Sequence, residues 1–169
     1  MKKWRGIMEI LELNHFDSKK NLIYQEKNIK NIIHTKGEEL ILKILFAGES
    51  VPSQYYIGLD SRSSLSRDSD ISAIYGLEPT QNYYSRQKVD SNGFAISTVS
   101  SGIRADSPLM AFKAVGGSWG PVNNIFLSTN LGTDVNNNIL ISSVKLSRVI
   151  TVSDGETITM KMGMALSSC

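Results

Sequence analysis

The sequence predicts a mainly β fold, an antiparallel β-sandwich of jelly-roll type with an N-terminal β-hairpin and one α-helix. Three observations support this prediction. Short apolar segments of strand length recur, with turn residues at intervals of roughly 8–12 residues, which is typical of sandwiches and barrels. The last of these segments, 158–166, alternates with period two. The one segment with helical periodicity, by contrast, lies before residue 48.

The composition is that of one ordinary globular domain. The chain has 169 residues, of which 41% are hydrophobic and 20% are charged, and a chain of this size fills a single core. The net charge of +2 comes from residues scattered along the sequence, so nucleic acid is not expected as a partner.

Neither an export signal nor a membrane span is predicted. Glu9 and Glu12 interrupt the apolar stretch that would have to follow the basic start of the chain. The longest apolar run, 40–47, is broken by Lys43 and is far shorter than the roughly 20 residues of a membrane span. We therefore expect a soluble protein with no membrane partner. The only cysteine, Cys169, excludes an intrachain disulfide.

The first 48 residues are expected to form an N-terminal hairpin and helix extension. Segments 7–13 and 21–26 are short and apolar and are joined by polar turn residues, as in a β-hairpin. Thr35 and Glu38 have the spacing of a capping box at a helix start. Gly48 and Pro52 are expected to end the helix, whose apolar stripe is Leu40, Ile41, Ile44 and Leu45.

Residues 49–169 are expected to form the sandwich, within one structural domain overall. Segment 60–70 is predicted to be a polar surface loop, followed by a short helical turn over 71–75. The glycine, proline and asparagine clusters between segments mark turns. The predicted strands are 55–59, 83–89, 94–99, 109–114, 124–128, 139–146 and the alternating final strand.

The sequence contains no recognisable catalytic or metal site. His15 and His34 both lie in the N-terminal extension, His15 in a predicted turn and His34 beside the helix start, and nucleophilic catalysis needs a base held against a nucleophile. Asp60, Asp68 and Asp70 share one loop and could hold a hard cation, but the EF-hand spacing is absent, and solvated loop acids with Asp68 or Asp70 as a helix cap are the better explanation. We expect neither an enzyme nor a cofactor.

Several aromatic and methionine side chains are candidates for subunit contacts. Trp119 either plugs one end of the sandwich, with its N–H on a carbonyl, or lies exposed at an interface. Adjacent tyrosines on a strand would point one ring inward and one outward. The methionine face of the last strand suits either the core or a subunit seam. The candidate interface residues are Tyr55, Tyr56, Tyr83, Tyr84, Trp119, Met160, Met162 and Met164.

A series of segments in order resembles a family of small structural proteins of tailed bacteriophages, labelled head decoration, minor structural or tail-fibre proteins. The segments that carry the resemblance are 52–59, 77–79, 84–87, 118–122 with 126–127, and 152–157. The resemblance covers about residues 31–166 and implies a virion component without catalytic residues. The glycine that usually precedes the Tyr-Arg pair is here Tyr83.

The leading functional hypothesis is a capsid decoration, or cement, subunit of the virion. Its expected partners are copies of itself, in a trimer or another symmetric cluster, and the major capsid protein. The hairpin would reach a neighbour by adding strands to an exposed sheet edge. The alternatives are a tail, neck or baseplate component and a carbohydrate-binding adhesin module that uses the paired tyrosines.

Overall fold

The computed structural model describes residues 4–99, 102–132 and 134–168, and for residues 4–8 and 166–168 it describes the backbone alone. The strands are β1 (Trp4–Phe16), β2 (Leu22–Lys30), β3 (Ile32–Ile33), β4 (Gln54–Asp60), β5 (Gln87–Asp90), β6 (Ala95–Val99), β7 (Gly102–Asp106), β8 (Met110–Lys113), β9 (Trp119–Ser128), β10 (Leu140–Val152) and β11 (Thr157–Ser168). The helices are α1 (Thr35–Phe46) and the short 3-10 turns η1 (Ile71–Ile74) and η2 (Ser91–Gly93). Cys169 lies outside the described residues.

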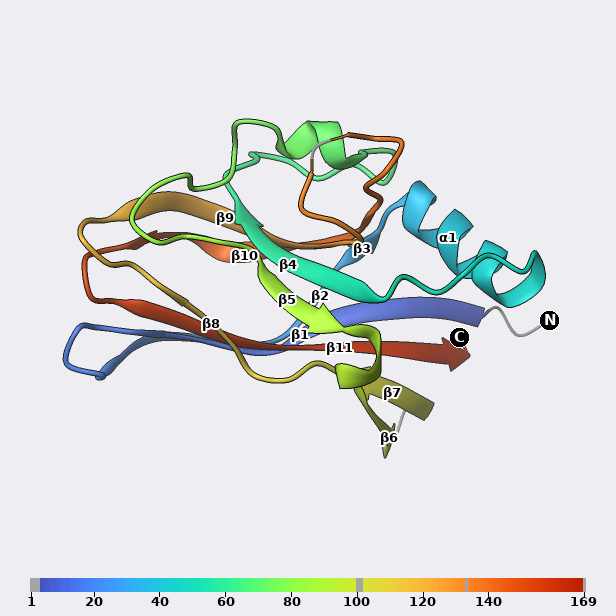
Figure 1. Ribbon diagram of the computed structural model, residues 1–169. Helices are drawn as coiled ribbons and strands as arrows, with labels where there is room; N and C mark the ends of the chain where they lie inside the picture. Colours follow the sequence, from blue (N-terminus) through green and yellow to red (C-terminus); the bar gives the residue numbers. More distant parts are fainter. Residues whose placement is uncertain (1–3, 100–101, 133, 169) are drawn as a thin grey trace.

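Two antiparallel sheets face each other, so the predicted β-sandwich with an N-terminal hairpin and one α-helix is confirmed (Figure 1). Sheet A has the order β2-β1-β11-β7-β6, with β8 also paired to β11. Sheet B has the order β3-β10-β9-β4-β5. The chain crosses from one sheet to the other after β2, β5, β8 and β10, so each sheet is built from strands that are far apart in the sequence.

The N-terminal hairpin is part of sheet A. Strand β1 pairs with β11 from Trp4 opposite Ser168 to Phe16 opposite Thr157. Its inward side chains Ile10 and Leu13 are fully buried in the core cluster that both sheets share. The extension predicted for residues 1–48 therefore supplies a central strand of the sandwich.

The final strand, β11, shows how an alternating sequence places side chains on opposite faces of a sheet. Ile158, Met160 and Met162 are at most 2% exposed and face the core, while Thr159 and Lys161 between them are only partly buried. A side-chain period of two places these residues on opposite faces of the sheet. The side chain of Leu166 lies outside the described residues.

Helix α1 has the predicted position but a different start. Its N-cap is His34, whose side chain makes no capping hydrogen bond, so the predicted capping box is wrong. The Thr35 hydroxyl donates instead to Asp68 Oδ1 at 2.8 Å, and Glu38 pairs with Arg67. At the other end Gly48 has φ +71°, a conformation that glycine adopts without strain, and the helix ends as predicted.

Several strand boundaries differ from the prediction. The strand predicted over 83–89 begins only at Gln87, because Tyr83 lies in a turn with φ 66°. The strand predicted from 124 begins at Trp119, so the segment taken as a turn forms the start of β9. Strand β7 was not predicted at all.

Candidate interaction surfaces and the buried polar network

The outer face of sheet B is covered by the segment that joins β4 to β5, with η1 lying above the sheet (Figure 1). Ile71 and Ile74 of η1 form a second, small apolar cluster with Phe126 and Leu140 of the sheet. In the register, Gly58 lies opposite Phe126 and Asp60 opposite Asn124. Residues that stand directly opposite in a ladder share one face, so Asp60 and Asn124 also point to this covered outer face.

Asp60 and Arg62 form a buried ion pair at this face. The Asp60 carboxylate is 0% exposed and the Arg62 side chain 5%. The guanidinium donates from Nε at 2.9 Å and from Nη2 at 2.8 Å, and Asn124 Nδ2 donates to the same carboxylate at 2.8 Å. Buried charges need such partners, because an isolated charge out of water is strongly destabilising.

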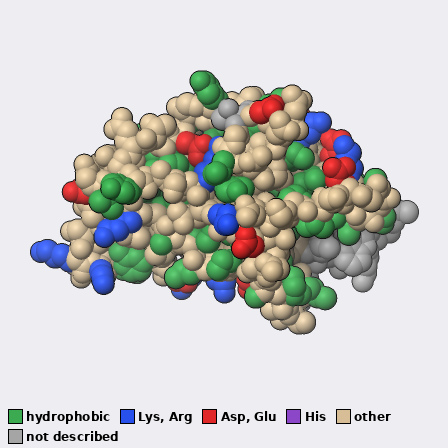
Figure 2. All heavy atoms as spheres, viewed as in Figure 1, with side chains coloured by type: hydrophobic (Ala, Val, Ile, Leu, Met, Phe, Trp, Pro, Cys, Tyr) green, Lys and Arg blue, Asp and Glu red, His purple; other side chains and the backbone are tan. Residues whose placement is uncertain are grey.

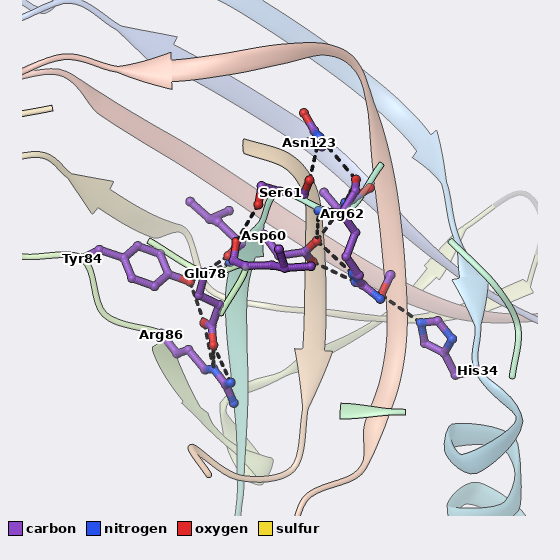
Figure 3. Close-up of polar contacts among 12 residues, drawn as sticks. His34, Asp60, Ser61, Arg62, Glu78, Tyr84, Arg86 and Asn123 are labelled. Atoms are coloured by element: carbon purple, nitrogen blue, oxygen red, sulfur yellow. Dashed lines mark hydrogen bonds and ion pairs between the residues drawn. The ribbon is translucent and has the colours of Figure 1, made fainter. Parts of the chain in front are cut away.

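The ion pair continues to helix α1 through a serine. Arg62 Nη2 donates to Ser143 Oγ at 2.8 Å, and Ser143 Oγ lies 2.8 Å from His34 Nε2 (Figure 3). Burial, and next the charge of Arg62, lower the pKa of His34 below its ordinary value. The network therefore favours a neutral imidazole that accepts the serine hydrogen.

The His34 and Ser143 pair lacks two features of a serine–histidine catalytic dyad: access for a substrate and a carboxylate that orients the imidazole. Both residues are 0% exposed, so in this conformation no substrate reaches the hydroxyl. The nearby carboxylate, Asp60, is bonded to Arg62 and Asn124 rather than to the imidazole. No local pattern in the sequence predicts this network, because its members come from four separate segments: His34, Asp60 with Arg62, Asn124, and Ser143.

A second ion pair lies beside the first on the same face (Figure 3). Arg86 donates to both carboxylate oxygens of Glu78, with Nη2 at 2.6 Å, and its guanidinium lies 5.0 Å from the centre of the Phe126 ring. Tyr84 donates from its hydroxyl to Glu78 at 3.0 Å and accepts the Leu59 backbone N–H at 2.7 Å. Burial, together with the charge of Glu78, raises the pKa of Tyr84 well above its ordinary value. These contacts fix the covering segment to β4.

The loop acids have local structural partners. Asp70 caps η1 by accepting the Ser72 backbone N–H at 2.9 Å, as the capping interpretation predicts, and Asp68 accepts the Thr35 hydroxyl. Within residues 4–99, 102–132 and 134–168, no cluster of three or more His, Cys, Asp or Glu side chains is placed to hold a metal ion. His15, predicted to be a turn residue, instead lies buried in β1 with Nε2 at 2.9 Å from Glu156.

Three of the candidate interface side chains are buried inside the chain. Trp119 is 5% exposed, Met162 2% and Met160 0%, so the interface prediction does not agree with their positions. The Trp119 ring packs against Tyr84, with ring centres 5.6 Å apart. Among the described residues its indole N–H has no acceptor, so the predicted bond to a carbonyl is wrong.

The remaining candidates divide between core and surface. Tyr55 packs edge-on against Phe94, with ring centres 5.8 Å apart, and the Tyr56 hydroxyl donates to Gln54 at 2.8 Å. Met164 is partly buried against the core. Tyr83, at 82% exposure, is the only one of the four tyrosines that projects freely, so the paired tyrosines do not form an exposed aromatic platform.

Large apolar side chains are exposed elsewhere, which sequence reasoning missed. Leu42, Leu45, Phe46 and Val51, here called the helix patch, are 57%, 61%, 81% and 56% exposed at the C-terminal half of α1 and just beyond it. Leu45 was expected in the buried stripe, but only Leu40 of that stripe is fully buried. Hydrophobic side chains are also visible over the β6–β7 hairpin at the lower edge of the molecule (Figure 2).

A shallow groove of about 400 Å³ separates α1 from segment 135–140. Its lining mixes Lys36 and Lys43 with Glu39, Glu49 and Asp70, and Glu39 pairs with both lysines. These mutual ion pairs leave no single charge to select a ligand. No helix in the described part of the chain is long and apolar enough to cross a membrane.

Comparison with known proteins found no matching family model, no matching curated protein and no matching solved structure.

Proposed function

We propose that this protein is a structural subunit of a tailed-bacteriophage particle, and specifically a capsid decoration subunit that stabilises the shell by binding the major capsid protein and copies of itself. The proposal starts from the resemblance to small phage structural proteins, which rests on several segments that follow one another in the same order between residues 31 and 166. The role needs a rigid body and an apolar docking surface, and it needs no catalytic group.

The observation that carries the proposal is the helix patch. Leu42, Leu45 and Phe46 are exposed on one side of α1, Val51 is exposed in the segment just after it, and none of the four contributes to either core cluster. Contiguous exposed apolar surface on a soluble domain marks a contact site for another macromolecule. Aromatic and large aliphatic side chains such as Phe46 are the groups that act as anchors in such contacts.

We do not retain the N-terminal hairpin as the proposed docking element. Strand β1 is held between β2 and β11, and β2 carries Glu26, Lys27 and Lys30 along the outer edge. Charged residues on an edge strand oppose the addition of a further strand. The helix patch replaces the hairpin as the proposed contact with the shell.

The test is immunogold labelling of purified particles with antibody against this protein. Gold over the head is the expected result. Gold confined to the tail or neck would overturn the decoration role in favour of a tail, neck or baseplate component. The complete absence of the protein from purified particles, by gold and by mass spectrometry, would overturn a structural role of either kind.

The contact surface is tested by adding purified protein to particles that lack it. Phe46→Glu should reduce binding at least tenfold, because it places a charge in the apolar contact. Val149→Glu is the matched control, since Val149 is also exposed (61%) but lies on β10 away from the patch. Equal binding by the two variants would show that the helix patch is not the contact.

A further inference from the structure

Strand β6 is an edge of sheet A without the features that normally protect an edge. Its partner among the described strands is β7 alone. Its sequence, Ala95-Ile96-Ser97-Thr98-Val99, contains no charge and no proline. Natural edge strands are usually blocked by lysine, proline, a bulge or a cover, so β6 is open to pairing with another strand.

The opposite edge of the same sheet is blocked. Strand β2 has charged residues, its backbone at Asn28 has φ 54°, and its register with β1 shifts between His15 and Phe16. In sheet B, edge strand β5 carries Lys88 and Asp90, and edge strand β3 has two residues. Strand β8, which pairs with β11 alone, has four residues and ends in Lys113. Among these edges of the described strands, β6 is the one with an uncharged strand of five residues.

The apolar face beside this edge continues the core of the sandwich. Ile96 lies opposite Ala105, and Ala105 lies opposite Met164, which belongs to the same face of β11 as the core residues Met160 and Met162. Yet Ile96 is 70% exposed and Ile103 on β7 is 61% exposed. This part of sheet A extends past the cover that sheet B provides.

We propose that β6 pairs antiparallel with β6 of a second copy of this chain, which joins the two A sheets into one and places Ile96 beside the strand of the other copy. With the two-fold axis at Ser97, Ile96 lies opposite the partner's Thr98 and Ala95 opposite the partner's Val99, so every cross-strand pair is uncharged and is made of β-branched or small side chains. This self-complementarity favours a second copy as the partner. The inference rests on the proposed function in that it names the surface through which that subunit would self-associate.

The first test is the mass of the purified protein by size-exclusion chromatography with light scattering over a concentration series. The wild type should reach twice the chain mass of 18.6 kDa. Ile96→Lys should stay at the chain mass, and Val149→Lys should behave as the wild type. A wild type that stays monomeric throughout, or an Ile96→Lys variant that still dimerises, would overturn the pairing. Circular dichroism of each variant establishes that it is folded.

The second test needs no destabilising substitution. Ser97 is the central residue of β6, so symmetric antiparallel pairing places it beside its equivalent. In a Cys169→Ser background, Ser97→Cys should give a disulfide-linked dimer with oxidised glutathione, while Val149→Cys should not. Equal cross-linking of both would overturn the proposal. Dimers without labelled particles would count against the proposed function alone, and labelled particles with monomeric protein against the pairing alone.

Discussion

The replacement of Arg62 by methionine tests whether the polar network under the covering segment stabilises the fold. Methionine keeps much of the aliphatic length and removes the guanidinium. The Asp60 carboxylate, at 0% exposure, would keep the Arg62 backbone N–H at 2.9 Å and the Asn124 amide at 2.8 Å. It would lose both guanidinium hydrogen bonds and the positive charge.

The expected loss follows from burial. Removal of one member of a buried ion pair costs about 3–5 kcal/mol, because a charge remains without its partner in a poorly solvated site. The control is Arg67→Met, which breaks the pair with Glu38, where the side chains are 63% and 42% exposed. An exposed pair of this kind contributes about 1 kcal/mol or less.

Urea unfolding followed by circular dichroism measures both variants, with the midpoint and slope fitted separately. The double variant Asp60→Asn with Arg62→Met removes both charges and should recover at least half of the loss. If Arg62→Met lowers the free energy of unfolding no more than Arg67→Met does, the buried pair does not contribute the stability that its geometry implies.

Three further predictions use the same unfolding measurement. Gly37→Ala should cost about 1–3 kcal/mol in spite of better helix propensity, because a Cβ there would overlap the carbonyl oxygen of Ile141. Gly132→Ala is the control and should be neutral, because a Cβ there meets only the Asp134 backbone nitrogen at 3.9 Å, an ordinary contact; equal effects would contradict close packing of α1. Tyr83→Gly should stabilise by about 0.5 kcal/mol, since residue 83 has φ 66° and the relief of left-handed strain outweighs the entropy of glycine; a clear loss would show that the exposed ring makes a contact of its own. Because burial lowers the pKa of His34 below its ordinary 6.5, the unfolded chain takes up the proton first, and the free energy of unfolding should fall by at most about 1.4 kcal/mol per unit as pH drops from near 6.5 toward the lowered value. Over this pH interval the free energy of unfolding of His34→Gln should fall less than that of the wild type. Identical pH profiles for the two proteins would refute the assignment of this pH dependence to His34.

Local patterns in the sequence were sufficient to predict a strand wherever apolar residues recur with a simple period. The alternation after Ile158 and the apolar hairpin segments predict strands because the side-chain period of a strand is two. Strand β7 was missed because Arg104 and Asp106 interrupt its apolar character. In the fold these two residues pair with each other, with Arg104 Nε at 2.5 Å from Asp106, so the charges are compatible with a strand.

Contacts between distant segments could not be predicted from any local pattern. Thr35 and Glu38 have the spacing of a capping box, but each finds a partner about thirty residues away in the loop after β4, at Asp68 and Arg67. A tertiary partner competes with the local one, and here it prevails. Tyr83 shows the same limit, because its positive φ of 66°, a conformation in which glycine is favoured, is set by the turn and not by its own residue type.

The polar network and the helix patch are mechanically linked. The same loop that carries Arg62 and Arg67 contacts the start of α1, where the Thr35 backbone N–H donates to the Arg67 carbonyl at 2.9 Å and the His34 backbone N–H donates to Ile141 at 2.9 Å. These bonds set the position of α1 against β10, and with it the orientation of Phe46 at the far end of the helix. The β6 edge, in contrast, belongs to sheet A and shares none of these contacts. Because energetic effects at separate sites without shared partners add, the two proposed contacts, the shell at the helix patch and a second copy at β6, are expected to respond independently to substitutions at either site.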